Sequence, residues 1–332
     1  MSYESLLPLM HKCKTKLSPK GFHSIINIVF HDHEALVYDK MHNDMQQSLL
    51  QQMDLLVLDV QQYLTLERQN LTLLDIGCGT GMSTETLLKT NVGNQIKHVT
   101  LLDSSPKMLE IALQKAKTWQ VDHVGKNGDI AQIDNDFDVV LICSVLHHIP
   151  DLALFLKQVI PKIKPGGILI HLQDPNGDFA HNQEFIARLM QFKDLQNAHK
   201  KEFKMANLIP KKVKHFINLK LGKKNYIDHI NDDLLKKNAI KKRLTADEIW
   251  SVTDIHVPSK TNIFSSGITY NFLEKKLHEF KNISRRTYGF FGVLKSDLPI
   301  EFQKREQYLI AQNNLSGRNL ACVWQKNNLI NS

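Results

Sequence analysis

The stretch that decides the fold is Leu73-Leu-Asp75-Ile-Gly77-Cys-Gly79-Thr-Gly81, in which an apolar run leads into three glycines at alternate positions. A short apolar run is typical of a buried strand. Glycine is favoured where the backbone must turn sharply and approach a ligand closely, because it carries no Cβ atom. A helix that begins near Met82 would direct its free N–H groups at the same turn. The stretch therefore predicts a strand, a ligand-binding turn and a helix, with a plain strand–helix turn as the alternative.

The spacing of these glycines narrows the class of ligand. A dinucleotide site has the pattern G-x-G-x-x-G, whereas here the spacing is G-x-G-x-G and the next residue is Met82. The Lys-Ser/Thr ending of a phosphate-binding P-loop is also absent. The turn is therefore predicted to bind neither NAD nor a nucleoside triphosphate.

Short apolar runs alternate with helical stretches on both sides of the turn. The apolar runs are residues 71–76, 99–102, 139–143 and 168–172, and the helical stretches are residues 82–90, 105–118 and 151–163. Strands that alternate with helices indicate right-handed βαβ units and a parallel sheet covered on both faces. The predicted fold class is α/β.

The alternation holds only in the middle of the chain. Residues 34–65 contain no Gly or Pro and read as one helix, and residues 180–243 are helical, rich in lysine and broken by Pro210 and Gly222. A capping box at Thr245–Glu248 predicts a further helix start. Helices near 268–280 and 299–311 and strands near 284–291 and 319–325 complete the prediction. We expect a helical leader (1–70), a core (71–176), a Lys-rich helical cap (177–265) and a C-terminal part of the core sheet (266–332).

The middle of the chain resembles the class I S-adenosylmethionine-dependent methyltransferases. Asp75–Gly81 fits their first motif, and Asp103 ends the second strand, where the family places an acid that accepts both ribose hydroxyls. Asn127-Gly128-Asp129-Ile130 looks like the segment whose acid meets the adenine amine, and 137–144 and 164–167 resemble the fourth strand and the turn before the fifth. The resemblance implies a Rossmann-like sheet of seven strands, the last antiparallel, with S-adenosylmethionine at the carboxyl ends of the strands.

The resemblance also implies a set of cofactor-binding residues. They are Asp75, Gly77, Cys78, Gly79, Gly81, Asp103, Ser104, Asp129, Ile130 and Ser144. Cys78 is expected only to line the loop as a small residue. For Asp103 a second role is open, because Ser104-Ser105-Pro106 follows it and it could also cap the next helix.

The segment Val145-Leu-His147-His148-Ile-Pro-Asp151 follows the fourth strand. Methyltransferases that act on nucleic-acid bases carry an Asn/Asp-Pro-Pro-aromatic motif here, and this chain does not. The segment is similar to the small-molecule branch of the family (type 11/12). Adjacent histidines should point apart, so we predict no metal site; His148 is a candidate base at neutral pH.

Further acceptor-side candidates come from the leader and the fifth strand. His33, Tyr38 and His42 have near-helical spacing and could share a face over the pocket, with His31 nearby; a polar helix surface is the alternative. His171 and Asp174 lie at the end of the fifth strand, although Asp174 before Pro175 could equally be a turn residue.

The net charge of +8 is a local feature. Residues 193–243 contain 15 basic side chains against 5 acidic ones. This segment could be a solvated cap, a lid over an anionic substrate, a dock for an acidic carrier protein, a membrane-surface helix or an RNA groove. Its one arginine, Arg243, and few aromatics disfavour RNA. Because an insertion after the fifth strand lies above the acceptor pocket in this fold, we favour a lid.

These observations predict a methyltransferase that acts on a small-molecule or carrier-bound metabolite, with an anionic acceptor favoured. An RNA-modifying methyltransferase is the alternative, and a non-catalytic S-adenosylmethionine-binding regulatory protein is a third hypothesis. The four scattered cysteines lack C-x-x-C spacing, which suits a reducing compartment. No signal peptide or run of 18 apolar residues is present. We therefore expect a cytoplasmic protein without a transmembrane segment.

Overall fold

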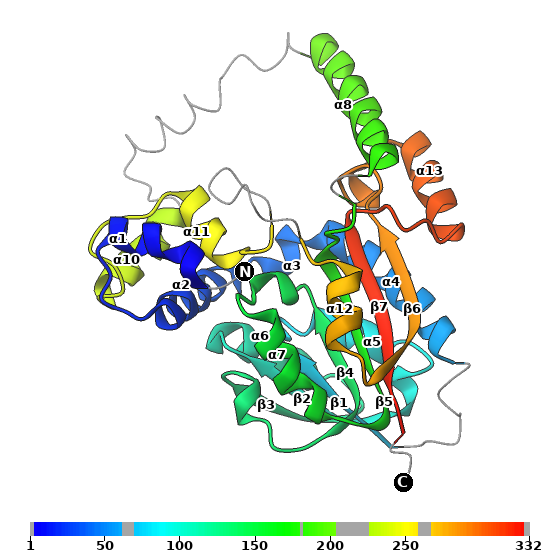
Figure 1. Cartoon of the computed structure of the whole chain (residues 1–332), viewed down its shortest axis with the longest axis horizontal. Helices are drawn as coiled ribbons and strands as arrows, with labels where there is room; N and C mark the ends of the chain where they lie inside the picture. Colours follow the sequence, from blue (N-terminus) through cyan, green and yellow to red (C-terminus); the bar gives the residue numbers. More distant parts are fainter. Residues whose placement is uncertain (1–2, 62–69, 180–181, 204–225, 258–266, 329–332) are drawn as a thin grey trace.

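Seven strands form one sheet in the order β3-β2-β1-β4-β5-β7-β6 (Figure 1). The computed structural model describes residues 3–61, 70–179, 182–203, 226–257 and 267–328. Strands β1 to β5 pair in parallel, and β7 is antiparallel to both of its neighbours, β5 and β6. The strands are β1 (Leu71–Ile76), β2 (Ile96–Asp103), β3 (Asp122–Asn127), β4 (Phe137–Cys143), β5 (Ile163–Pro175), β6 (Phe280–Tyr288) and β7 (Asn319–Lys326). The predicted seven-stranded, mostly parallel sheet is confirmed.

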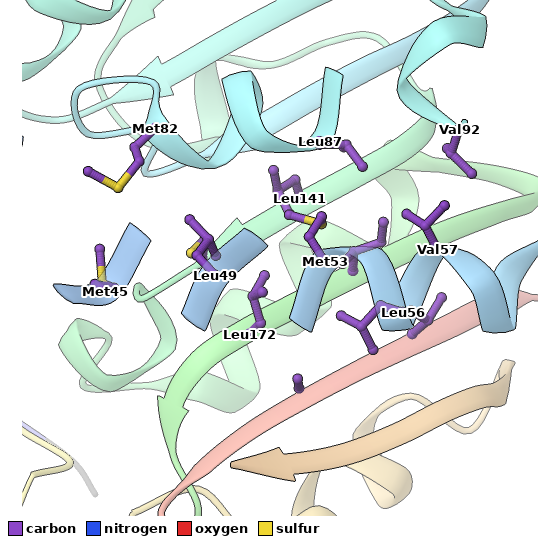
Figure 2. Packing of buried hydrophobic residues seen from close by; sticks show 14 of the residues in the cluster. Met45, Leu49, Met53, Leu56, Val57, Met82, Leu87, Val92, Leu141 and Leu172 are labelled. Atoms are coloured by element: carbon purple, nitrogen blue, oxygen red, sulfur yellow. The ribbon is translucent and has the colours of Figure 1, made fainter. Parts of the chain in front are cut away.

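Helices cover both faces of this sheet. On one face lie α4 (Asn43–Val60), α5 (Met82–Leu88) and α6 (Pro106–Ala116), and on the other lie α7 (Leu152–Val159) and α12 (Tyr270–Lys276). The side chains Leu49, Met53, Leu56 and Val60, which recur at helical spacing, are all fully buried. Figure 2 shows Leu49, Met53 and Leu56 of this stripe facing α5 and the strands. Burial of such a stripe explains why the period of the sequence predicts α4 correctly.

The first two helices pack away from the sheet, against the second half of the cap (Figure 1). They are α1 (Leu7–Cys13) and α2 (Pro19–Glu34), and their partners are α10 (Tyr226–Lys236) and α11 (Ala246–Thr253). Phe22 and Ile26 from α2 share one buried cluster with Ile230 from α10 and Ile249 and Val252 from α11. We call these four helices the leader–cap bundle. The leader is therefore divided between two hydrophobic cores, since α4 belongs to the sheet.

The predicted single helix over 34–65 is wrong. Helix α2 ends at Glu34, a short α3 (Tyr38–Met41) follows, and α4 begins at Asn43. The break has a physical cause, because the apolar stripe of α2 faces the leader–cap bundle whereas that of α4 faces the sheet. The connecting segment leaves Leu36 87% exposed.

The pattern also misses one strand. The apolar pattern does not predict strand β3, because β3 lies at the edge of the sheet and most of its side chains are exposed, including His123 and Lys126. Without an apolar face, such a strand shows no alternation in the sequence.

The C-terminal third follows the prediction more closely. The capping box is present, with Thr245 and Glu248 each bonding the other's backbone N–H at the start of α11. Helix α13 (Ile300–Ala311) and strand β7 lie where they were predicted. Strand β6 instead begins at Phe280, and the buried residues Phe290 and Phe291 follow it in a turn.

Helix α8 (Gln183–Phe203) is the described part of the first half of the cap. Pro210, Gly222 and the lysines between 211 and 224 lie outside the described residues. All four cysteines are free and buried. Among the described helices, none is both long and apolar enough to cross a membrane.

Candidate active site

The three glycines of the turn after β1 all adopt left-handed backbone conformations. Their φ angles are 67° at Gly77, 53° at Gly79 and 81° at Gly81. The N–H of Gly77 donates to the carbonyl oxygen of Leu102 at 2.7 Å, which ties the turn to the end of β2. A Cβ atom at Gly77 would lie 2.5 Å from Cγ2 of Val145, whereas a Cβ at Gly79 would have no atom within 4 Å. Glycine is thus needed at position 77 for packing, while position 79 faces open space.

Asp103, at the end of β2, holds this turn from the other side. Its Oδ2 accepts from the N–H of Gly79 at 2.8 Å and its Oδ1 accepts from the N–H of Ser105 at 2.7 Å. Burial raises the pKa of Asp103. The suggestion that Asp103 caps the next helix is wrong, because Ser105 is the N-cap of α6 and accepts from the N–H of Met108. Asp103 is free for a ligand-binding role, with one lone pair left on each oxygen.

Asp75, at the end of β1, is fully buried. Its Oδ2 accepts from the hydroxyls of Ser83 and Thr84 at 2.9 and 2.5 Å. Its Oδ1 is buried with no hydrogen-bond partner in the described part of the chain. Burial, with a smaller contribution from the charge of Asp103, raises the pKa of Asp75 to about 6. Sequence reasoning did not single out Ser83 and Thr84, although they occupy the first turn of α5.

The remaining cofactor candidates lie on neighbouring loops. Asp129 is exposed and accepts from the N–H of Ala131 at 3.0 Å, whereas Ile130 is buried. Ser104 is exposed, and its carbonyl oxygen accepts from Nδ2 of Asn127. Ser144 has a φ of 60° and donates its N–H to Leu172. The β2 and β3 loops therefore meet where the family places the nucleoside.

A cavity lies at the carboxyl ends of β1 and β4. The residues that line it come from the leader, the glycine turn, α5 and the end of β4, and they are Tyr38, Met45, Leu49, Gly77, Cys78, Gly79, Thr80, Met82, Ser83, Cys143 and Ser144. Tyr38 is thus brought to the predicted cofactor residues, and α4 supplies two more apolar side chains. The leader and the glycine turn after β1 therefore line the same cavity.

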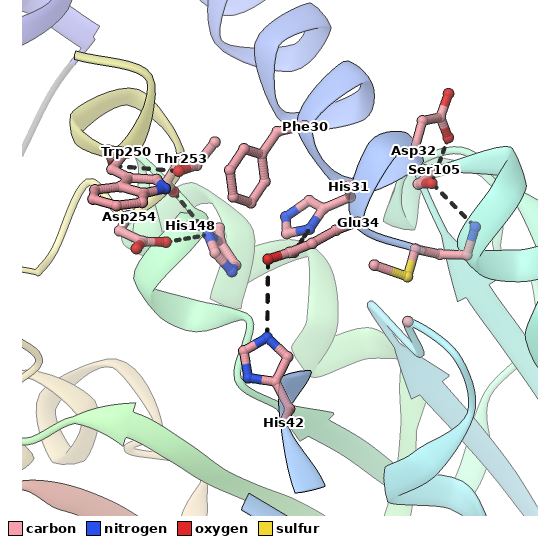
Figure 3. Close-up of polar contacts among 12 residues, drawn as sticks. Phe30, His31, Asp32, Glu34, His42, Ser105, His148, Trp250, Thr253 and Asp254 are labelled. Carbon is pink, nitrogen blue, oxygen red and sulfur yellow. Dashed lines mark hydrogen bonds and ion pairs between the residues drawn. The ribbon is translucent and has the colours of Figure 1, made fainter. Parts of the chain in front are cut away.

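Two aspartates of the leader fasten it to the cofactor loops. Asp39 accepts from the hydroxyl of Thr80 at 2.5 Å and pairs with Lys115. Asp32 accepts from the hydroxyl of Ser105 at 2.6 Å, as Figure 3 shows. The sequence carries no local signal for these contacts, because the partners are more than 40 positions away.

His33 does not share a face with Tyr38 and His42, because it lies in α2 whereas Tyr38 begins α3 and His42 directly follows it. His33 pairs with Asp233 of α10 at 2.9 Å, and it does not line the cavity. His42 lies against Tyr38, with ring centroids 4.4 Å apart, and its Nε2 is 3.9 Å from Oε1 of Glu34. His33 therefore belongs to the leader–cap bundle.

His171 is buried in the core rather than exposed to an acceptor. Its Nε2 accepts from the indole N–H of Trp324 at 3.1 Å, and burial lowers the pKa of His171 to about 4. Asp174 is not a turn residue, because it lies within β5 and is almost fully buried. It accepts from the backbone N–H of His147 at 3.1 Å and from the Nδ1–H of the same residue at 2.8 Å.

The two adjacent histidines after β4 converge, contrary to expectation. They lie in a 3-10 turn, Leu146–His148, and their ring centroids are 4.0 Å apart. The Nδ1–H of His148 donates to the carbonyl oxygen of Thr253 at 2.7 Å (Figure 3). Burial lowers the pKa of His148 well below its usual value, so the imidazole is neutral. The argument that adjacent side chains point apart applies to strands and is wrong in a tight turn.

The sheet order, the left-handed glycine turn and the acid at the end of β2 agree with the Rossmann-like fold that the resemblance to class I methyltransferases implies. Residues 74–169 match the family model described as a methyltransferase domain.

The chain is also similar to two curated relatives and to one solved structure. The chain is 34% identical over 119 residues to demethylmenaquinone methyltransferase of Tropheryma whipplei, a match that covers 34% of this chain and 44% of the relative. It is 33% identical over 104 residues to ubiquinone biosynthesis O-methyltransferase of Paramagnetospirillum magneticum, a match that covers 31% of this chain and 40% of the relative. The match spans less than half the length of either relative. The plantazolicin methyltransferase in complex with SAH is 15% identical, over 92% of this chain and 96% of that one, with a TM-score of 0.43.

Proposed function

We propose that this protein binds S-adenosylmethionine in the glycine turn and transfers its methyl group to a small-molecule acceptor. The observation that carries the proposal is the pairing of a left-handed glycine turn with the carboxylate of Asp103, joined by the Gly79 N–H bond. The relatives named for demethylmenaquinone methylation and for ubiquinone biosynthesis support a small-molecule acceptor.

The residues of the turn suit a cationic ligand. The charge of Asp103 helps to raise the pKa of Asp75, and Oδ1 of Asp75 has no partner among the described residues. S-adenosylmethionine carries a sulfonium and an ammonium group, either of which would relieve this repulsion. In the proposed complex Asp103 accepts the ribose hydroxyls, Asp129 and Ile130 contact the adenine, and Asp75 faces the amino-acid end. The absence of a Cβ at Gly79 leaves room for the backbone to approach the ligand.

For methyl transfer the protein mainly has to hold the acceptor in line with the methyl group of the bound cofactor. The methyl donor supplies a good leaving group, so alignment of the acceptor atom behind the methyl carbon contributes most of the rate. Tyr38 is the predicted acceptor residue that lines the cavity, and we assign it a positioning role. His148 remains a candidate for receiving a proton from the acceptor. Of the other residues that the sequence suggested, His33 pairs with Asp233 and His171 is buried against Trp324.

An anionic or carrier-bound acceptor remains a prediction. Its basis is the run of lysines between 211 and 224, which lies outside the described residues.

The test is methyl transfer from labelled S-adenosylmethionine into a native metabolite extract, with mass identification of the labelled product. The Asp103→Ala variant serves as the matched control. The proposal predicts a labelled small molecule with the wild type and at least tenfold less with the variant. Label found only in RNA would support the alternative substrate, and cofactor binding without any labelled product would indicate a regulatory protein.

A further inference from the structure

Three side chains of the types that bind metal ions lie close together after β4. His147 and His148 follow β4, and Asp254 comes from the end of α11. The potential ligand atoms of all three residues lie within 4.8 Å of one another. Among the described residues this is the only such group of three. All three side chains are partly buried.

The two distances from Asp254 to the histidines are close to those between the ligands of a tetrahedral site. Oδ1 of Asp254 is 3.3 Å from Nδ1 of His148 and 3.9 Å from Nε2 of His147. Ligand atoms at about 2.0–2.2 Å from a tetrahedral zinc ion lie about 3.3–3.6 Å from each other. Asp254 has a side chain 38% exposed, so its carboxylate can rotate to close the small remaining difference.

Asp174 prepares His147 for coordination. The Nδ1–H of His147 donates to the buried carboxylate of Asp174, which leaves the lone pair on Nε2 directed away from it. The backbone N–H of His147 donates to the same oxygen, so the ring is held at two points. Ligating histidines in metal sites almost always donate their second N–H to such a carboxylate or carbonyl. Asp174 has its other oxygen, Oδ2, buried without a partner in the described part of the chain.

The charge of the surroundings favours a cation. The carboxylates of Asp174, Asp254 and Glu34 lie around these imidazoles, and Glu34 is held as a carboxylate by His31 and His42, which lower its pKa to about 2. Figure 3 shows that His148 lies between Asp254 and the leader residues His31 and Glu34. His148 now donates its Nδ1–H to Thr253; coordination through Nδ1 would move that proton to Nε2 and leave the imidazole neutral.

We propose that His147, His148 and Asp254 bind one divalent transition-metal cation of the zinc type. Two imidazole nitrogens and one carboxylate are the donor set of such ions, and three protein ligands leave one position open. This proposal does not depend on methyl transfer, because it concerns binding of the ion alone; a metal-bound His148 would not also receive a proton from the acceptor.

The test is a calorimetric titration of chelator-treated, full-length protein with zinc chloride, and the visible absorption of the cobalt(II) form. Asp254→Asn is the main variant. Asp122→Asn is the matched control, because Asp122 lies 3.3 Å from Nδ1 of the exposed His98, the same distance that separates Asp254 from His148. The proposal predicts one zinc ion per chain in the wild type and the control, with affinity at least tenfold lower in Asp254→Asn.

Wild-type affinity in Asp254→Asn, or no zinc-dependent difference between it and the control, would overturn the proposal. His148→Gln provides a second variant in case Asp254→Asn fails to fold, which thermal unfolding without zinc will reveal. It should lose the tetrahedral cobalt bands as well. Retention of those bands in His148→Gln would also contradict the proposed ligand set.

Discussion

The backbone N–H of Gly79 donates to Oδ2 of Asp103 at 2.8 Å, which joins the turn after β1 to the end of β2. The two residues are 24 positions apart, and each is placed by a different strand. Because a single bond couples them, the geometry of the turn and the position of the acid are set together. A ligand that contacts either residue would therefore meet both.

Substitution of the glycines should separate packing from ligand binding. Gly77→Ala places a Cβ 2.5 Å from Val145, so we expect a lower melting temperature and loss of cofactor binding together. Gly79→Ala meets no protein atom, so it should cost only about 1 kcal/mol in backbone strain. Gly79→Val, with a branched side chain in the ligand's space, should weaken cofactor binding at least tenfold. Thermal unfolding and calorimetry of the three variants test this, and equal destabilisation by both alanines would contradict it.

Asp75 predicts a pH dependence of cofactor affinity. Its pKa is raised to about 6, so the native protein binds a proton more tightly than the unfolded chain does. This contribution to the free energy of unfolding is present at low pH and is lost as the pH rises through about 6. The cationic cofactor prefers the carboxylate, so its affinity should rise over the same range. Calorimetry between about pH 5 and pH 8 should show this rise in the wild type and a flatter profile in Asp75→Asn; the same slope in both would exclude Asp75 as the cause.

The contacts of Asp39 predict that the leader and the cofactor site are coupled. Asp39→Asn removes the charge that pairs with Lys115 and weakens the bond from Thr80. We expect faster hydrogen exchange in α3 and cofactor affinity lowered several-fold. Asp122→Asn, on the exposed edge strand, is the control. An α3 that exchanges at the wild-type rate would show that the contact contributes nothing to the position of the leader.

The leader–cap bundle should unfold as a unit. Phe22 is fully buried among side chains of α10 and α11, so Phe22→Ala should destabilise the bundle by about 3–5 kcal/mol. Hydrogen exchange should accelerate in α10 and α11, which are more than 200 positions away, and less in β1 and β4. Acceleration confined to α1 and α2 would show that leader and cap fold separately.

Much of the core could be predicted because its signals are local. The apolar runs of β1, β4 and β5 and the glycine turn are each readable within ten residues, and the burial of Asp75 and Asp103 follows from their places at strand ends. Helix α11 was predicted from four residues, since a capping box is complete within one turn. Such features depend on backbone conformation and burial alone.

The features that could not be predicted depend on partners that are far away in the sequence. Asp32 and Asp39 receive their roles from Ser105 and Thr80, and His33 is drawn to Asp233 of the cap. The break after Glu34 has the same origin, because the two helices face different cores. The sequence does not predict that the rings of His147 and His148 lie close together, because this arrangement requires a 3-10 turn. Such a short turn has no repeating pattern of apolar residues that could reveal it.

Cofactor binding at the turn joined to Asp103 is measured most directly by isothermal titration of S-adenosylmethionine into the wild type and Asp103→Ala. The account predicts one binding site per chain in the wild type and an affinity at least tenfold lower in the variant, with the melting temperature of the unliganded protein reported alongside. Equal affinity in the two folded proteins would contradict the assignment of this site.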